Sequence, residues 1–237
     1  MPHFYVNPKE ISNNVFTLTG EQFHYLTGVR RFSAGEEINI FDGLGNSFRA
    51  KIKTITKTFL TGEIISALDF ILPAIKITLF TAMPKGERFE WLIEKCAELG
   101  VSKIVPVITA RSVINEISEN KFERYKKISI SASSQSNRAD LMAIEPPLKF
   151  KNAVEFVYKQ DSALNLIPWE CEESNTIDNI YKQTKNINIF IGPEGGFENS
   201  ETEYAFKNNI TPVTLGKNIL RVETAALAAC ILVINKS

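Results

Sequence analysis

The sequence predicts an α/β protein in which a mainly parallel sheet follows a small N-terminal β-barrel. Residues 1–72 contain short runs of β-branched or alternating apolar residues, separated by turns. After Pro73 the pattern changes, because apolar strands alternate with amphipathic helices as far as the C-terminus. Such alternation is typical of parallel sheets that carry helices on both faces. We therefore expect two domains, residues 1–72 and residues 73–237.

The N-terminal domain is expected to contain four strands and one short helix. The strands alternate apolar with polar residues or are rich in β-branched residues, and they are expected at residues 14–19, 37–41, 47–55 and 58–65. Asp42-Gly43 and Gly45-Asn46 mark a tight hairpin turn, since glycine and asparagine adopt the positive φ angles that such turns need. The helix is expected over residues 21–29 and ends at Arg30 and Arg31.

The C-terminal domain is expected to alternate strands with helices. Apolar runs predict strands at residues 75–83, 103–109, 163–167, 187–191 and 212–215. Helices are expected at residues 87–99, from 120 to the polar run 133–138, at 177–184, from 200 onward and at 224–234. Gly100 is placed to end the first of these helices. Asn120 with Glu123, and Ser200 with Glu203, have the spacing of capping boxes at helix starts.

Composition indicates a soluble globular protein. The chain has 237 residues, of which 44% are hydrophobic and 23% charged, as in proteins with one packed core or two. No apolar run approaches the roughly 20 residues that cross a bilayer, and the first residues do not resemble a signal peptide, so we expect a cytoplasmic protein. Three widely spaced cysteines, at positions 96, 171 and 230, predict neither a disulfide framework nor a metal site.

Charge is balanced overall but unevenly distributed. The chain has 27 basic and 27 acidic residues. Residues 76–138 hold 11 Lys and Arg against 7 Asp and Glu, whereas residues 139–237 hold 9 against 13. The local positive excess permits a site for an anionic partner, and a solvated helix face explains it equally well. Charge alone therefore leaves the partner open.

Two glycine-bearing turns each leave the end of an apolar strand and lead toward a helix. The first reads Ile191-Gly192-Pro193-Glu194-Gly195-Gly196-Phe197, and the second is Leu215-Gly216. The fingerprints of nucleoside triphosphatases and of dinucleotide-binding proteins are both missing. Loop sterics alone would explain the first turn. The second turn, followed by Arg221, Glu223 and Thr224 at a helix start with unbonded N–H groups, favours a small-molecule pocket at the carboxyl edge of the sheet.

These motifs resemble the signature of the bacterial small-subunit (16S) ribosomal RNA uridine-N3 methyltransferases of the SPOUT superfamily, which use S-adenosylmethionine. Lys85-Gly86-Glu87-Arg88, the stretch 94–100 and Arg111-Ser112-Val113 are also similar to that family. His24, Arg31, Gly35 and Asp42-Gly43 fit its N-terminal PUA-like β-barrel, which binds RNA. The resemblance implies a trefoil knot in the C-terminal domain and a homodimer. It also implies small-subunit ribosomal RNA, or the assembled small subunit, as partner, and no metal.

The resemblance also implies roles for individual residues. The methyl-donor pocket would be formed by Ile167, Pro168, Ile191, Gly192, Pro193, Glu194, Gly195, Gly196, Leu215, Gly216, Ile219, Leu220, Arg221, Glu223, Thr224 and Ala225. Because the uracil N3 nitrogen must lose its proton to react, Arg138 and Arg221 would stabilise the anion. Glu194 and Glu223 would accept the proton, although a helix cap or an arginine partner explains Glu223 as well. RNA contacts are expected from Arg30, Arg31, Arg49, Lys85, Arg88, Arg111, Gln135 and Arg138.

The chain departs from the family pattern next to Gln135. Ser134 occupies the position of a family glutamate, and Met142 that of a proline, while Gln135, Ser136 and Arg138 agree with the pattern. Two alternatives therefore stay open. One is a methyltransferase that acts on another ribosomal or transfer RNA position, and the other is a non-catalytic RNA-binding module. Titration with S-adenosylmethionine separates an enzyme from a module.

Overall fold

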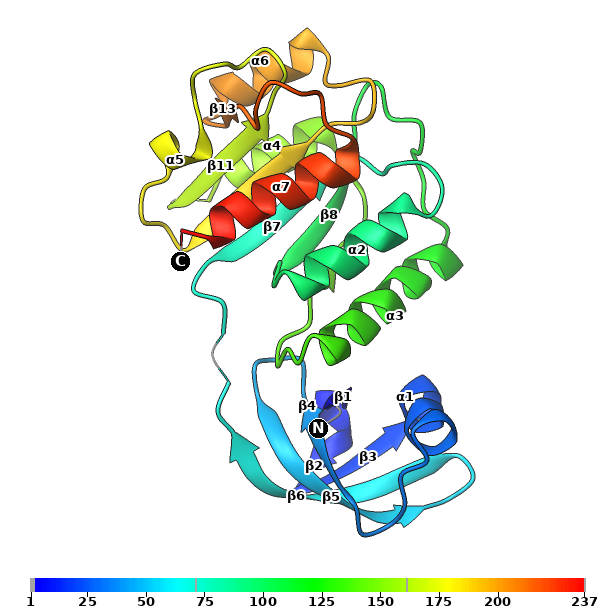
Figure 1. The fold of residues 1–237 in the computed structure, drawn as a ribbon. Helices are drawn as coiled ribbons and strands as arrows, with labels where there is room; N and C mark the ends of the chain where they lie inside the picture. Colours follow the sequence, from blue (N-terminus) through cyan, green and yellow to red (C-terminus); the bar gives the residue numbers. More distant parts are fainter. Residues whose placement is uncertain (1–2, 71, 161, 237) are drawn as a thin grey trace. The chain divides into compact units, whose positions relative to one another are not determined.

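The protein divides into two compact units, which we describe separately from a computed structural model (Figure 1). The structure describes residues 3–70, 72–160 and 162–236. Unit 1 comprises the described residues up to Leu72 together with Ile130–Leu141, and unit 2 comprises Pro73–Ser129 and the described residues from Met142 onward. The chain thus changes unit next to Pro73, where the sequence pattern changes. The grouping of Ile130–Leu141 with unit 1 has no counterpart in that pattern.

Unit 1 contains a curled, six-stranded sheet (Figure 1). Its strands are β1 (His3–Tyr5), β2 (Ile11–Ser12), β3 (Val15–Thr19), β4 (Glu37–Phe41), β5 (Ser47–Ile55) and β6 (Phe59–Leu68). They follow the order β1-β4-β5-β6-β3-β2, in which β1 and β4 pair in parallel and the other neighbours are antiparallel. Register shifts within the β5–β6 pair add the local twist that lets a sheet curl. The predicted barrel-like N-terminal fold is confirmed.

The core of unit 1 lies inside the curled sheet and depends on one close backbone approach. Phe16, Ile38 and Leu60 are among the fully buried side chains of this core. A Cβ atom on Gly62 would lie 2.4 Å from the ring of Phe16, so only glycine fits opposite that ring. The expected helix over residues 21–29 forms as α1 (Gly20–His24), which continues into the π-helical turn η2 (Tyr25–Val29). A short 3-10 helix, η1 (Pro8–Glu10), joins β1 to β2.

Unit 2 contains a seven-stranded sheet in which the described strands pair in parallel, as predicted. The strands are β7 (Lys76–Thr81), β8 (Lys103–Ile108), β9 (Ala143–Ile144), β10 (Leu148–Lys149), β11 (Ala163–Pro168), β12 (Asn186–Ile191) and β13 (Thr211–Val213). Six of them follow the order β10-β8-β7-β12-β11-β13, and β9 pairs with β8. At the centre, the rings of Phe80 and Phe190 stack with centroids 4.6 Å apart. The parallel α/β fold class predicted from the sequence is confirmed; the trefoil knot stays a prediction.

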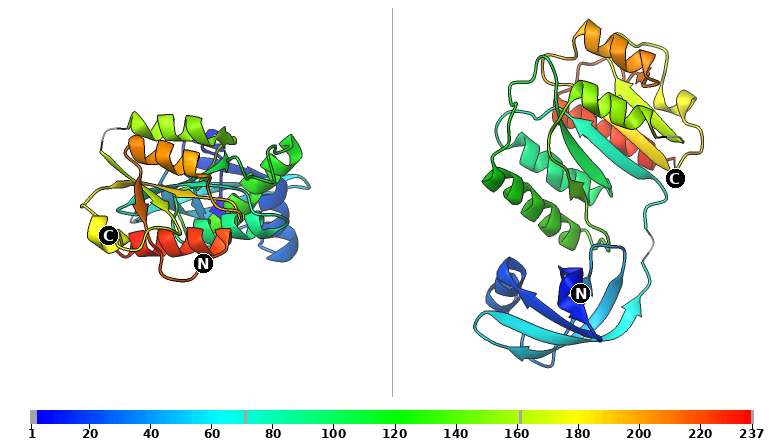
Figure 2. Two further views of the ribbon diagram at one scale, coloured as in Figure 1. Left: turned by 90° about the horizontal axis from the view of Figure 1, so that it is seen from above. Right: turned by 180° about the vertical axis from the view of Figure 1, so that it is seen from behind.

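Helices cover both faces of this sheet (Figure 2). The helices of the chain's second part are α2 (Arg88–Glu98), α3 (Glu119–Gln135), α4 (Phe150–Tyr158), α5 (Ile177–Ile180), α6 (Asn199–Lys207) and α7 (Val222–Ile234). Helices α2 and α7 pack together on one face, and α4 and α6 on the other. None of the helices in the described part of the chain has the length and apolarity to span a membrane.

Three predicted details of the helices are wrong. Helix α3 begins at Glu119, so Asn120 lies inside the helix and does not form the predicted N-terminal capping box with Glu123. Helix α6 begins at Asn199, with Glu198 and Glu201 forming the capping box instead of Ser200 and Glu203. Burial of Phe197 in the core ends the preceding loop early, so the helix starts sooner than the Ser-x-x-Glu spacing suggests. Helix α5 ends at Ile180, four residues before the expected end.

Candidate functional site

The candidate site lies at the carboxyl edge of the unit 2 sheet. Because β7, β11, β12 and β13 are parallel, the segments that leave their ends emerge at the same edge. Backbone bonds continue beyond the strands: the Ala82 N–H donates to the Ile191 carbonyl at 2.9 Å, and the Trp169 N–H donates to the Val213 carbonyl at 3.0 Å. The first glycine turn therefore starts from β12 and the second from β13, and β11 lies between these two strands and pairs with both.

The first glycine turn has little room for side chains at two of its positions. The Gly196 N–H donates to the Pro193 carbonyl at 2.9 Å and closes a turn, with Gly196 at φ +69°. A Cβ atom on Gly196 would lie 2.9 Å from a carboxylate oxygen of Glu170, and one on Gly192 would lie 3.0 Å from the Phe197 ring. Phe197 is buried and anchors the end of the turn in the core. Gly192 is therefore required by its packing against Phe197, and Gly196 by its backbone conformation, because the exposed Glu170 side chain can move away from a Cβ atom.

Arg111, predicted as an RNA contact, holds the glycine turn from outside. Its guanidinium donates to the Gly195 carbonyl at 2.7 Å and lies 4.0 Å from the Glu198 carboxylate. The preceding Ala110 N–H donates to the Glu201 carboxylate at 2.9 Å. The loop that leaves β8 is thus fastened to the glycine turn and to the start of α6. Sequence analysis did not indicate this positioning role.

Glu194 and Glu223, the two predicted proton acceptors, are brought together by Arg88. The Arg88 guanidinium lies 3.9 Å from a Glu194 carboxylate oxygen and 4.0 Å from one of Glu223. Glu194 also accepts a hydrogen bond from the Lys85 N–H at 3.4 Å. Arg88, at the start of α2, therefore links the β12 turn to the first turn of α7. This cluster joins three segments that are far apart in the sequence.

Glu223 differs from Glu194 in its burial. Its side chain is only 12% exposed, and its Oε2 atom is buried without a hydrogen-bond partner among the described residues. A buried oxygen without a hydrogen-bond donor lowers the stability of the fold by about 1–3 kcal/mol, unless a ligand or a water molecule donates to it. Glu223 therefore offers an acceptor atom for a group that the polypeptide itself does not supply.

The second glycine turn and the start of α7 present backbone groups. Gly216 has φ +111°, and a Cβ atom there would meet no described atom within 4 Å. Arg221 is the N-cap residue of α7, and the described part of the chain offers no side-chain cap at this end. The first helical bond that reaches back to Arg221 comes from the Ala225 N–H, at 2.8 Å. The N–H groups of the first turn are therefore available to an anionic or carbonyl oxygen.

The remaining predicted pocket residues belong to the same edge but differ in exposure. Ile167 and Ile191 are buried in the sheet, so their side chains form the core beneath the turns. Pro168 and Leu220 are half-buried, and Ile219 is 92% exposed. Three further pocket positions, at Leu215, Thr224 and Ala225, are half-buried or exposed around the second turn. The predicted pocket residues thus lie at one edge of the sheet, where some are buried beneath the turns and others are exposed around them.

Arg138 belongs to unit 1, where its guanidinium is tied to the protein. Its side chain is 6% exposed and donates to the Asp140 carboxylate at 3.1 and 2.7 Å. The surrounding backbone pairs with the turn after β4, because the Leu141 N–H donates to the Gly43 carbonyl at 3.1 Å. Gln135 is exposed, and the Ser134 hydroxyl donates to the Ile130 carbonyl at 2.9 Å. The serine that replaces the family glutamate is therefore engaged within its own helix.

The other predicted RNA contacts differ in how far they are engaged. Arg30, Arg31 and Lys85 are exposed. Arg49 forms an ion pair with Glu37 at 2.9 Å, across the β4–β5 pair. Among the described residues, no group of three or more His, Cys, Asp or Glu side chains is arranged to hold a metal ion.

Comparisons with known proteins agree with this architecture. Residues 72–234 match the family model described as an RNA methyltransferase domain, and residues 18–65 match an RNA methyltransferase PUA domain. The ribosomal RNA small subunit methyltransferase E of Synechocystis is 34% identical over 228 residues, which is 94% of this chain and 74% of the relative. The protein of the same name from Rickettsia conorii is 32% identical, over 95% of this chain and 91% of the relative.

Solved structures cover the chain almost completely. A ribosomal RNA small subunit methyltransferase E from Neisseria gonorrhoeae, bound to S-adenosyl methionine, has a TM-score of 0.90 and 30% identity, over 100% of this chain and 98% of that one. A putative methyltransferase from Legionella pneumophila in complex with the same cofactor has a TM-score of 0.88 and 29% identity, over 99% and 97%. The family predicted from the glycine turns and the PUA-like fold of unit 1 are confirmed. The chain belongs to the family of RNA methyltransferases whose curated members are named ribosomal RNA small subunit methyltransferase E.

Proposed function

We propose that this protein methylates the N3 nitrogen of a specific uridine in small-subunit (16S) ribosomal RNA, within the assembled small subunit, with S-adenosylmethionine as donor. The observation that carries the proposal is the convergence of both glycine turns and the α7 start at one sheet edge, beside the buried, unpartnered oxygen of Glu223. Family membership and the cofactor-bound relatives support the donor. Uridine N3 as the acceptor rests on the resemblance.

The residues at the edge fit S-adenosylmethionine. When bound, this cofactor supplies a methyl group carried on a positively charged sulfur. The backbone around Gly192–Gly196 would line one side of the pocket, and Gly216, whose Cβ position meets no described atom within 4 Å, would leave space for the ligand. The rim residues Ile219 and Leu220 would cover apolar parts of the ligand, and the N–H groups at the α7 start would bind a polar oxygen.

Glu223 is the better candidate for the proton acceptor. The uracil N3 nitrogen carries a proton that must leave before or while the nitrogen attacks, so a base within hydrogen-bond reach accelerates the reaction. The Oε2 atom of Glu223 is buried and unpartnered, whereas Glu194 already accepts the Lys85 N–H. Arg88 keeps both carboxylates in place by its charge. Glu194 then positions the glycine turn, and Glu223 accepts the proton.

Two arginines are proposed to stabilise the negative charge that develops on the uracil. Arg221 is exposed at the start of α7, next to Glu223 in the pocket rim. Arg138 keeps the role that the resemblance implies, and its ion pair with Asp140 fixes the orientation of the guanidinium. A positive group that is held in place, as the Arg138 guanidinium is, lowers the free energy of an anionic transition state. RNA contacts are proposed for the exposed Arg30, Arg31 and Lys85, and the active form is proposed to be a cytoplasmic homodimer.

The test is methylation of small subunits purified from cells that lack this protein. Labelled S-adenosylmethionine is supplied, and the RNA is digested to nucleosides for mass spectrometry. We expect 3-methyluridine at one position, with faster transfer to assembled subunits than to naked 16S transcript. A methylated nucleoside of another kind would refute the acceptor, and absence of cofactor binding in calorimetry would favour a non-catalytic RNA-binding module.

A further inference from the structure

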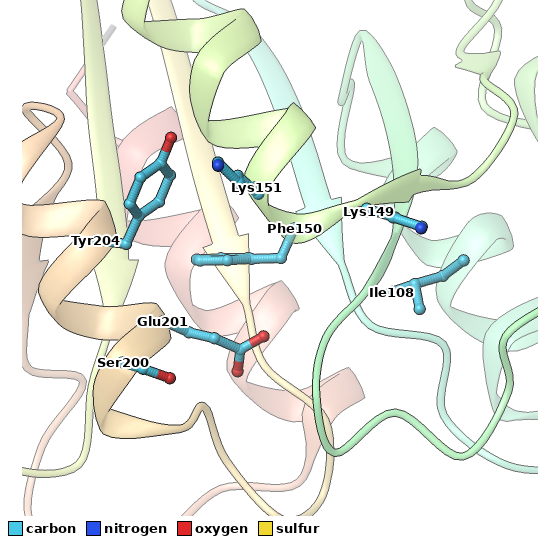
Figure 3. A pocket seen from close by; sticks show the side chains of 7 residues that line it. All are labelled: Ile108, Lys149, Phe150, Lys151, Ser200, Glu201 and Tyr204. Carbon is cyan, nitrogen blue, oxygen red and sulfur yellow. The ribbon is translucent and has the colours of Figure 1, made fainter.

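A hollow on unit 2 lies outside the glycine-turn edge and has no role in the function proposed above (Figure 3). It has a volume of about 410 Å³, which is within the usual range of small-ligand pockets. Three elements meet there: the end of β8, the start of α4 and the start of α6. The lining residues are Ile108, Lys149, Phe150, Lys151, Ser200, Glu201 and Tyr204.

The charge of the hollow suits an anion. Lys149 and Lys151 are exposed, and no ion pair links either of them to a described carboxylate. Lys149 is also the N-cap residue of α4, whose first N–H groups have no side-chain cap in the described chain. Glu201 is the opposing charge, but its two oxygens already accept the N–H groups of Ala110 and Glu198. The hollow is therefore lined by two exposed ammonium groups and by one carboxylate whose two oxygens already accept backbone hydrogen bonds.

The hollow also offers an aromatic surface. The Tyr204 hydroxyl donates to the Glu155 carboxylate at 3.1 Å, which fixes the ring against α4. The Lys151 ammonium lies 5.7 Å from the centre of that ring. In Figure 3 the Lys151 ammonium lies beside the Tyr204 ring with Phe150 below it, and the Lys149 ammonium lies at the other side of the hollow. An aromatic ring with a cation close to it is a combination that binds nucleobases and phosphates of single-stranded RNA.

We propose that this hollow binds one nucleotide of single-stranded RNA, with the base against Tyr204 and a phosphate held by Lys149 and Lys151. The proposal rests on the proposed function, because it assumes that RNA is the substrate. The hollow is also linked to the first glycine turn. The Ala110 N–H donates to Glu201 in the wall of the hollow, and the next residue, Arg111, donates to the Gly195 carbonyl in the turn. An RNA strand bound in the hollow therefore contacts the loop after β8, which also holds the first glycine turn.

The test measures RNA binding by the full chain. The probe is a fluorescein-labelled oligouridylate of about 12 nucleotides, within the usual site size of single-strand binding surfaces, and the readout is fluorescence anisotropy at several salt concentrations. The double variant Lys149→Ala/Lys151→Ala is compared with Lys159→Ala, which removes an exposed lysine at the opposite end of α4. Loss of two phosphate contacts should lower the slope of log affinity against log salt by about 1.4 for a single strand. Lys159→Ala should leave the slope unchanged.

The aromatic contact has a separate readout. Tyr204→Ala should weaken binding at least about fivefold, as expected for loss of one stacked base. Tyr204→Phe keeps the ring and should bind within twofold of wild type. Wild-type affinity and salt slope in the double lysine variant would overturn the inference, and so would equal affinities of Tyr204→Ala and wild type. Failure of the proposed function has a different signature, because the wild-type protein would then bind the probe without methylating small subunits.

Discussion

Replacement of Glu223 by glutamine tests whether this residue accepts the uracil proton or only supports the structure around the two glycine turns. The change preserves the size of the side chain and removes its charge. Because Oε2 is buried and unpartnered, the wild-type carboxylate carries a desolvation cost of about 1–3 kcal/mol that its Arg88 neighbour, 4.0 Å away, offsets only in part. The variant should therefore unfold at no lower a denaturant concentration than wild type. Its kcat should fall about 10²- to 10⁴-fold, the usual contribution of a general base.

The assay combines methyl transfer to purified small subunits with cofactor binding by calorimetry. We expect Glu223→Gln to bind S-adenosylmethionine within about threefold of wild type, because the backbone of the glycine turns would make most of the contacts. Glu194→Gln is the matched control: it loses an exposed ion pair worth at most about 1 kcal/mol and should lower kcat less than tenfold. The reasoning is refuted if Glu223→Gln keeps wild-type kcat, or if lost cofactor affinity accounts for the whole loss of activity.

Three further predictions concern unit 1 and the glycine turn. Arg138→Ala should abolish methylation and leave cofactor affinity nearly intact. It should also lower the unfolding free energy by about 2 kcal/mol, which is less than the about 3–5 kcal/mol of a fully buried pair, because Asp140 stays 22% exposed. An equal loss of activity in Asp140→Asn would make the role of Arg138 structural. Gly196→Ala should weaken cofactor binding about tenfold in calorimetry, because a Cβ atom at φ +69° adds backbone strain of about 1–2 kcal/mol to the glycine turn. Gly86→Ala, which has the same φ of +69° outside that turn, is the control. Equal losses of cofactor affinity in the two variants would contradict a role of the turn in binding. Burial lowers the pKa of His3 from 6.5 to about 4. The unfolded chain therefore binds the proton more readily, and the unfolding free energy should fall by about 3 kcal/mol as the pH drops from 7 to 4. The unfolding free energy of His3→Gln, measured in urea, should lack this part of the pH dependence, and a pH profile equal to that of wild type would contradict the lowered pKa of His3.

The sequence predicts strands of unit 1 well where one face is buried. Strands β4 and β5 have the predicted bounds, because alternating apolar residues such as Ile38 and Ile40 can bury only as a strand. Helix α4 was not predicted, although Phe150, Ala153, Val154 and Val157 have helical spacing and are buried. The usual start signal is missing, since Lys149 occupies the N-cap position and provides no side-chain acceptor. The strands β1, β2, β9 and β10 are two or three residues long, so their pairing depends on the assembled sheet.

At the site, the sequence predicts the backbone better than the side-chain partners. Glycine turns after apolar strands are local features, so their position at the sheet edge follows from the order of the residues. The partners of charged side chains are set by the tertiary fold. Arg88 and Arg111 were predicted as RNA contacts, yet both contact the glycine turn or its neighbours. No spacing rule relates Arg88 to Glu223, because the two residues meet only when α2 and α7 pack on the same face of the sheet.

The first glycine turn is held by more contacts than the second, at residues 216–219 of the same sheet edge. Phe197 anchors the turn in the core, Arg111 holds it from the β8 loop, and Glu194 links it to Lys85 and Arg88. A loop fixed from three directions loses little conformational entropy when a ligand binds, so it favours affinity through pre-organisation. The opposite rim, residues 216–219, is exposed and has open space around Gly216. We therefore expect the fixed side to set the orientation of the donor, and the exposed rim to be the side through which ligands enter and leave.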